Sequence, residues 1–102
     1  MLSMRRATRL VLASSVVGVT ACAQPPTDAE CLDLVERYTG KLLRANNPEL
    51  SEAEVLRLQS EARARAEDDP TLASCRERVS RSDYECAMHA PSPDEIEKCL
   101  LP

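Results

Sequence analysis

Apolar residues recur every three or four positions along most of the chain after residue 27, and polar or charged residues fill the positions between them. This spacing predicts α-helices with one apolar face, and no segment of useful length alternates at every second residue as a strand would. We predict helices at residues 28–44, 51–67, 70 onward and 93–101. The third of these either bends or restarts at Ser82. We therefore expect an all-α fold, a small bundle of three to four helices.

The predicted helix starts carry a second signal. Four times a serine or threonine is followed three residues later by glutamate, the spacing of a capping box, in which the two side chains satisfy backbone N–H groups of the first turn. One such pair is weak evidence, but four that each precede an apolar periodic run are strong evidence. A fifth start is predicted at Asp69-Pro70, because proline is favoured at the first helical position. The four pairs are Thr27 with Glu30, Ser51 with Glu54, Ser82 with Glu85, and Ser92 with Glu95.

The first 23 residues differ from the rest of the chain. Three arginines, Arg5, Arg6 and Arg9, precede an uncharged run of 14 residues that ends in small side chains. A basic segment, an apolar segment and a cleavage site with small residues are the parts of a secretory signal peptide. The apolar run is shorter than the roughly 20 residues that a membrane-spanning helix needs. We therefore predict that residues 1–21 are a signal peptide that directs export.

The end of this segment, VTAC at residues 19–22, resembles the lipobox of bacterial lipoproteins. The resemblance implies cleavage before Cys22 and attachment of a diacylglyceryl lipid, with acyl chains such as palmitate, to its sulfur. Residues 22–27 are then a lipid-anchored tether and residues 28–102 a helical domain. Ala23 occupies the position where an aspartate would resemble the inner-membrane retention signal, so the resemblance implies the outer membrane, facing the periplasm.

An alternative cleavage site overlaps the lipobox. Ala21, Cys22 and Ala23 also fit the AxA pattern of ordinary signal peptidase, and cleavage there would release a soluble secreted protein that begins at Gln24. The lipobox is favoured because a cysteine at the end of an apolar signal segment is rare by chance.

The charge and size of the exported part limit its partners and its core. Removing residues 1–21 takes away three of the thirteen basic residues and none of the seventeen acidic ones, which leaves ten basic against seventeen acidic residues and a net charge of −7. Such a surface is a poor partner for nucleic acid, and we expect no nucleic-acid binding. The chain contains no Trp or Phe. In so small a domain, hydrophobic burial alone seldom contributes more than ~3–5 kcal/mol, so covalent links are expected.

Four cysteines in the helical region, Cys31, Cys75, Cys86 and Cys99, are an even number in a chain predicted to be exported. An oxidising compartment favours their pairing, so we expect two disulfides that staple the bundle. If the third helix is continuous, Cys75 and Cys86 lie ~16 Å apart, which is too far for a disulfide. An up-down-up arrangement then favours Cys31–Cys75 with Cys86–Cys99. A sharp break at Ser82 leaves Cys31–Cys86 with Cys75–Cys99 open.

One arrangement near the C-terminus carries candidate chemistry. Cys86 and His89, the only histidine, are one helical turn apart, so a thiol with its base or, together with Cys75 and Cys99, a zinc site is an alternative hypothesis. The spacing lacks the close CxxC pair usual in zinc sites, and an exported thiolate must escape oxidation. We therefore predict no catalytic residue, no metal and no cofactor. Five arginines stand among acids and are expected on solvated helix faces, namely Arg63, Arg65, Arg76, Arg78 and Arg81.

The C-terminal third, CRERVSRSDYECAMHAPSPDEIEKC, resembles small four-cysteine helical proteins exported by GC-rich bacteria such as myxobacteria. The shared features over residues 75–99 are a cysteine, a Ser or Thr break, a Tyr-x-Cys helix and a short helix that ends in cysteine. Such proteins mostly have no assigned activity. The resemblance implies a disulfide-stapled helical module and nothing catalytic.

These features together predict a lipid-anchored protein of the bacterial cell envelope, with a non-enzymatic binding or accessory role near the membrane surface. The expected partners are the membrane, through the lipid on Cys22, and an envelope protein whose identity the sequence does not give. The alternatives are a soluble secreted helical protein and the thiol or zinc protein.

Overall fold

The computed structural model describes residues 24–101, and both the predicted signal peptide and Cys22 lie outside this range. Helices are the only regular elements of the described part, which confirms the all-α prediction. In chain order the five helices of residues 24–101 are α1 (Asp28–Asn46), α2 (Glu52–Glu67), α3 (Thr71–Arg78), α4 (Arg81–His89) and α5 (Pro93–Leu100). No helix within the described range is long and apolar enough to cross a bilayer.

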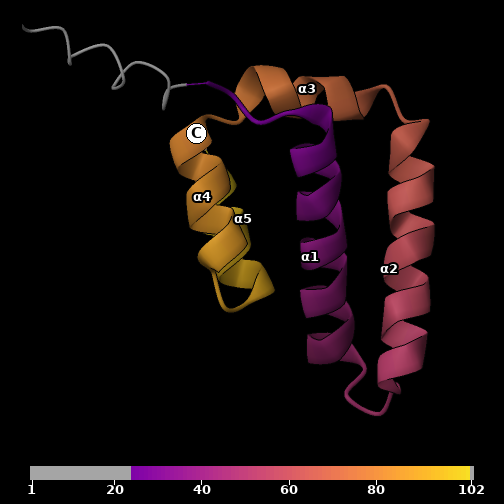
Figure 1. Ribbon diagram of the computed structural model, residues 1–102. Coiled ribbons are helices and arrows are strands. Elements are labelled where there is room, and N and C mark those ends of the chain that lie inside the picture. Colours follow the sequence, from indigo (N-terminus) through magenta and orange to yellow (C-terminus); the bar gives the residue numbers. More distant parts are fainter. Residues whose placement is uncertain (1–23, 102) are drawn as a thin grey trace, which may run out of the picture.

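Helix α1 lies at the centre of the fold (Figure 1). α2 packs along one side of α1 to form a helical hairpin, whereas α4 and α5 form a shorter hairpin on the other side. α3 crosses the end of the α1–α2 hairpin and leads the chain from α2 to α4. The architecture is therefore two helical hairpins that meet at α1 and are connected by one crossing helix.

Most helix starts agree with the sequence prediction. Thr27 and Ser51 each form a complete capping box with the glutamate three residues later. Ser92 Oγ accepts the N–H of Glu95 at 3.2 Å, which is one half of the predicted box. These contacts satisfy N–H groups that have no partner inside the first turn of a helix.

One predicted cap is wrong. Ser80, and not Ser82, is the N-cap of α4, and its Oγ accepts the N–H of Asp83 at 3.0 Å. The extended backbone of Val79 (φ −101°, ψ 121°) ends α3 and places Ser80 at the start of the next helix. This start puts Arg81 in the first turn of α4, where it binds residues distant in sequence. The third predicted helix is therefore two short helices, so the described part of the chain has five helices where three to four were predicted.

The main hydrophobic core lies between α1 and the α4–α5 hairpin. Ile96 and Ala87 have no exposed surface, and Tyr84 is 7% exposed. Partly buried apolar side chains, among them Tyr38 and Val79, pack around this cluster. The buried members of the cluster are Leu34, Tyr84, Ala87, Ala90 and Ile96.

The α1–α2 hairpin relies on fewer buried side chains and more polar contacts. Val55 is the one fully buried residue of α2. Gln59 Nε2 donates a hydrogen bond to the backbone oxygen of Glu36 at 2.7 Å, and Arg63 Nη1 binds Asp33 Oδ1 at 2.8 Å. Gly40 permits the close approach, because a Cβ atom there would collide with the Gln59 amide. The hairpin is thus held by polar contacts at close range as well as by burial.

Both disulfides follow the favoured pairing. Cys31 is bonded to Cys75 with a Cα–Cα distance of 6.3 Å, and Cys86 is bonded to Cys99 with a distance of 5.7 Å. The continuous third helix from which this pairing was inferred is not present. The predicted pairing is nevertheless found. α3 crosses the start of α1, which places Cys75 next to Cys31, and the α4–α5 hairpin places Cys86 next to Cys99.

Candidate functional site

None of the four cysteines that were predicted to form disulfides has a free thiol in the structure. Cys86, the thiol of the alternative hypothesis, is bonded to Cys99, and Cys75 is bonded to Cys31. His89 Nδ1 contacts the backbone oxygen of Glu85 at 2.8 Å. Within residues 24–101, no group of three or more His, Cys, Asp or Glu side chains is arranged to hold a metal ion. The oxidised protein therefore presents neither a thiolate nor a set of zinc ligands in this region.

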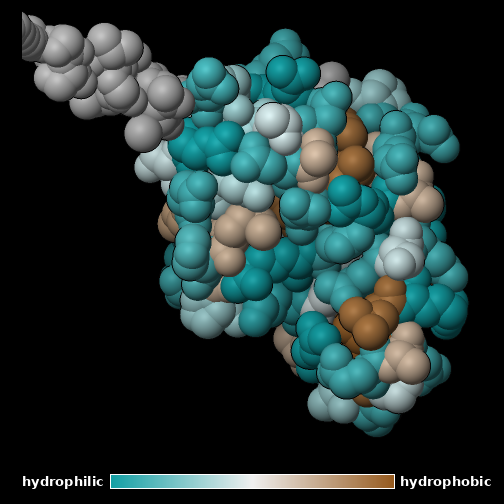
Figure 2. All heavy atoms as spheres, viewed as in Figure 1, coloured by the Kyte–Doolittle hydropathy of each residue, from teal (hydrophilic) through white to brown (hydrophobic). Residues whose placement is uncertain are grey.

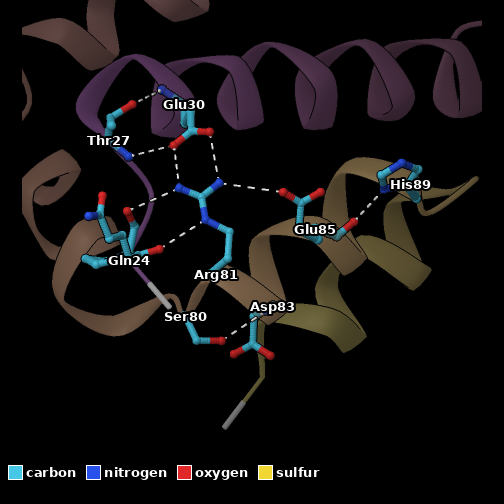
Figure 3. A network of polar contacts seen from close by, with 9 residues as sticks. Gln24, Thr27, Glu30, Ser80, Arg81, Asp83, Glu85 and His89 are labelled. Atoms are coloured by element: carbon cyan, nitrogen blue, oxygen red, sulfur yellow. Dashed lines mark hydrogen bonds and ion pairs between the residues drawn. The ribbon is translucent and has the colours of Figure 1, made fainter. Parts of the chain in front are cut away.

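Arg81 connects the first described residues to α1 and α4. Its Nη1 and Nη2 atoms donate to the two carboxylate oxygens of Glu30 at 2.9 and 2.8 Å. Its Nε and Nη2 atoms also donate to the backbone oxygens of Gln24 and Pro25, at 3.0 and 3.3 Å. Figure 3 shows these acceptors converging on one guanidinium, which is also 3.6 Å from a carboxylate oxygen of Glu85. The prediction that Arg81 lies on a solvated face is wrong, because its side chain is only 26% exposed. The same prediction is wrong for Arg63, which is 29% exposed and pairs with Asp33 and Glu36 of α1.

The segment before α1 is therefore part of the folded domain. Pro26 is among the most deeply buried residues of the described chain. The backbone oxygens of Gln24 and Pro25 are held by Arg81. The predicted tether, residues 22–27, thus has ordered structure from Gln24 onward.

Glu30 has two roles that both favour its charged form. It accepts the paired hydrogen bonds from Arg81, and its Oε1 atom accepts the N–H of Thr27 at 2.9 Å in the capping box. The pKa of Glu30 is lowered from 4.5 to about 2, mainly by the hydrogen bonds from Arg81 and secondly by the hydrogen bond from the Thr27 backbone. Hydrogen bonds that favour the carboxylate make protonation more difficult in the folded state than in the unfolded chain.

We expect the stability of the protein to fall as the pH drops from about 4.5 to about 2. The folded-state pKa of Glu30 is lower than its unfolded value, so its contribution is fully present above pH 4.5 and is lost as the pH approaches 2. Urea unfolding followed by circular dichroism at pH 7, 4.5, 3 and 2 measures this. Glu30→Gln is expected to lower the urea midpoint at pH 7, with a difference from wild type that vanishes near pH 2.

Glu49→Gln is the matched control, because Glu49 is exposed and makes no ion pair with another described residue. Its urea midpoints should follow those of the wild type at every pH. A Glu30→Gln variant whose midpoint differs from wild type equally at pH 7 and pH 2 would contradict the assigned role of the carboxylate.

A concave apolar surface lies beside α3, and we call it the apolar bowl. It has a volume of about 890 Å³. A stripe of α1 forms its floor, the end of α2 and the length of α3 form two sides, and the start of α4 with the end of α5 forms the third. In Figure 2, apolar atoms are exposed between α1 and α2 just below α3, among hydrophilic surroundings. Its lining residues are Cys31, Leu34, Val35, Tyr38, Ala62, Arg65, Ala66, Asp69, Thr71, Leu72, Ser74, Cys75, Arg78, Val79, Asp83 and Leu100.

The bowl exists because α3 does not fill the space beside α1. None of the side chains described for α3 is buried, and the helix is joined to α1 through the Cys31–Cys75 disulfide. The facing stripe of α2 carries Ala62 and Ala66, whose short side chains leave room. Ala62 and Ala66 lie one helical turn apart on α2, and their apolar period alone does not indicate a cavity. The signal that could have indicated a cavity is the pair of small residues at successive turns of one apolar stripe of α2.

The fold and site define a small helical domain with two disulfides, an N-terminal segment held by an arginine, and a concave apolar surface. No family model, curated protein or solved structure matches the chain.

Proposed function

We propose that this protein is a lipid-anchored, non-enzymatic component of the bacterial cell envelope, which binds another envelope component close to the membrane surface. The observation that carries the proposal is the docking of residues 24–26 onto the domain next to the lipobox cysteine, through hydrogen bonds from Arg81 to Gln24 and Pro25 and through the burial of Pro26. Only Ala23 separates Cys22 from the first docked residue.

The docked segment sets how far the domain can move from an anchor on Cys22. Two residues span at most about 7 Å in extended form, whereas a free tether over residues 22–27 would span about 20 Å. A lipid on Cys22 would therefore hold the surface around Arg81 against the bilayer. Two or three acyl chains make such an attachment stable, since one chain binds a membrane only weakly.

The other features agree with this location. Two disulfides indicate an oxidising compartment outside the cytoplasm. The order of basic segment, apolar segment and VTAC supports export and lipidation, and Ala23 after the cysteine supports sorting to the outer membrane. The disulfide-bonded state of the cysteines supports a binding role over thiol or zinc chemistry.

Intact mass and fractionation of the mature protein test the anchor. We expect the protein in the membrane fraction, with the mass of a chain that begins at a diacylated or triacylated Cys22. Cys22→Ala should remove both the lipid mass and the membrane association. A Cys86→Ala and Cys99→Ala double variant is the control, because it also lacks cysteines but keeps the lipobox. A soluble wild-type species that begins at Gln24 would contradict the proposal and support the secreted alternative.

A further inference from the structure

We propose that the apolar bowl binds a single-chain amphiphile with an anionic head group, such as a long-chain fatty acid or a lysophospholipid. The bowl holds the acyl chain, and Arg65 and Arg78 on its sides receive the carboxylate or phosphate. This assignment deepens the proposed function and rests on it for the source of the ligand, because a domain held at a bilayer surface is surrounded by such molecules.

The arginines of the domain supply the first argument. Six of the eight arginines in residues 24–101 bind a carboxylate or a backbone oxygen of another described residue. The other two, Arg65 and Arg78, have no such partner within this range, and both line the bowl. Each lies in the last turn of its helix, where the helix dipole favours a positive charge but provides no anion. The bowl therefore presents two exposed guanidinium groups that have no acceptor among residues 24–101.

Unlike the two arginines, the two carboxylates that line the bowl are already stabilised by neighbouring groups of the protein. Asp69 Oδ1 accepts hydrogen bonds from the backbone N–H and the hydroxyl of Thr71, at 2.9 and 2.8 Å, and the backbone bond is the main cause that lowers the pKa of Asp69. Asp83 lies in the first turn of α4, where the positive end of the helix dipole stabilises its charge. Both acids are thus stabilised by the starts of their own helices. The missing partner in the bowl is an anion and not a cation.

The size and lining of the bowl supply the second argument. Its volume of about 890 Å³ lies within the range of small-molecule sites, which is roughly 300–1,000 Å³. Most of the floor is apolar, so a simple inorganic anion would leave it uncovered. Arg65 and Arg78 are exposed at the side of the bowl, where they can reach a head group, and a purely apolar ligand would form no charge-assisted hydrogen bond with either. A molecule with one anionic head and one acyl chain satisfies both parts.

Photolabelling of the mature lipoprotein in phosphatidylcholine nanodiscs tests this assignment. A sixteen-carbon fatty acid that carries a diazirine is added, irradiated and located by peptide mass spectrometry. We expect saturable labelling on peptides that line the bowl, with competition by palmitate and by a lysophospholipid. The stronger competitor identifies the preferred head group. Hexadecanol, which has the same chain but no charge, should require an at least tenfold higher concentration, because the lost contacts are charge-assisted hydrogen bonds.

Substitution of the arginines provides the specific readout. Arg65→Gln combined with Arg78→Gln should raise the half-saturating fatty-acid concentration about tenfold or more and should abolish the preference for palmitate over hexadecanol. Arg57→Gln is the matched control, because Arg57 is exposed, pairs with Glu61 and does not line the bowl. Circular dichroism checks that each variant is folded.

Three results would overturn the assignment: labelling outside the bowl, equal competition by hexadecanol, or equal effects of the control and the double variant. A photoreactive residue at position 66 that crosslinks in cells to a protein, with no lipid adduct, would also overturn it. The intact mass from the same samples separates this outcome from the anchor. A protein without lipid on Cys22 that still shows charge-dependent labelling contradicts only the anchor, and a lipidated protein without labelling contradicts only the bowl.

Discussion

Replacing Cys31 and Cys75 together with alanine is expected to lower the free energy of unfolding by about 4 kcal/mol. The disulfide closes a loop of 44 residues, and the chain-entropy relation assigns that amount to a loop of this length. A domain this small has a net stability of only ~4–11 kcal/mol. The substitution therefore removes a large part of the total, and we expect a markedly lower urea midpoint at pH 7.

The same variant should release α3 before the rest of the fold. None of the side chains described for α3 is buried, and Cys75 is its covalent link to α1. Hydrogen exchange followed by mass spectrometry should show loss of amide protection in α3 under conditions where α4 and α5 are still protected. Because α3 forms one side of the bowl, the double variant should also lose saturable fatty-acid labelling.

The second disulfide is the control for this prediction. Cys86–Cys99 closes a loop of 13 residues, so its removal should cost about 3 kcal/mol and should affect the α4–α5 hairpin first. If removal of Cys31–Cys75 left the urea midpoint unchanged, or if α3 kept its protection, the role assigned to this disulfide would be wrong.

The elements of the fold were predictable because their signals are local. The complete capping boxes at Thr27 and Ser51 mark the starts of α1 and α2 within one residue. The apolar period predicted amphipathic helices, and apolar residues on that period such as Leu34 and Ile96 are buried. The even number of cysteines after Cys22 predicted two disulfides. Each of these signals depends on neighbours in sequence or on a simple count.

The errors arise where distant contacts decide between local alternatives. The stretch SRSDYE offers a cap at Ser80 or at Ser82, and the capping-box rule favours Ser82 because glutamate follows it at the right spacing. The protein uses Ser80, and Arg81 then binds Glu30, 51 residues away. A charge pattern on one helix could not reveal this partner. The sequence therefore indicated that Arg81 was solvated.

The bowl was not predictable for a related reason. Periodicity identifies an apolar face but does not say whether another element covers it. Val35, Ala62 and Ala66 belong to such faces, yet they line a concave surface beside α3. Whether the face is filled depends on the length and path of α3, and these are set by the disulfide and by the break at Val79. The candidate site is thus a consequence of how short helices are connected.

Replacing Ile96 with alanine is expected to lower the free energy of unfolding by about 3 kcal/mol. Ile96 has no exposed surface and lies in the cluster that joins α5 to α1 and α4. Truncation removes apolar contacts and leaves a cavity, and such changes typically cost ~2–5 kcal/mol. The higher helix propensity of alanine offsets a few tenths of a kcal/mol. Urea unfolding measured by circular dichroism gives the difference.

Leu56→Ala is the matched control, because Leu56 is 59% exposed and should change the unfolding free energy by no more than about 0.5 kcal/mol. The Ile96 variant also tests whether the two hairpins unfold together. They share α1, so loss of the core between α1 and α5 should destabilise α2 as well, and amide protection in α2 and α4 should be lost at the same urea concentration. If α2 kept wild-type protection while α4 lost it, the α1–α2 hairpin would be an independent unit, and the bowl between the hairpins would depend on the disulfides alone.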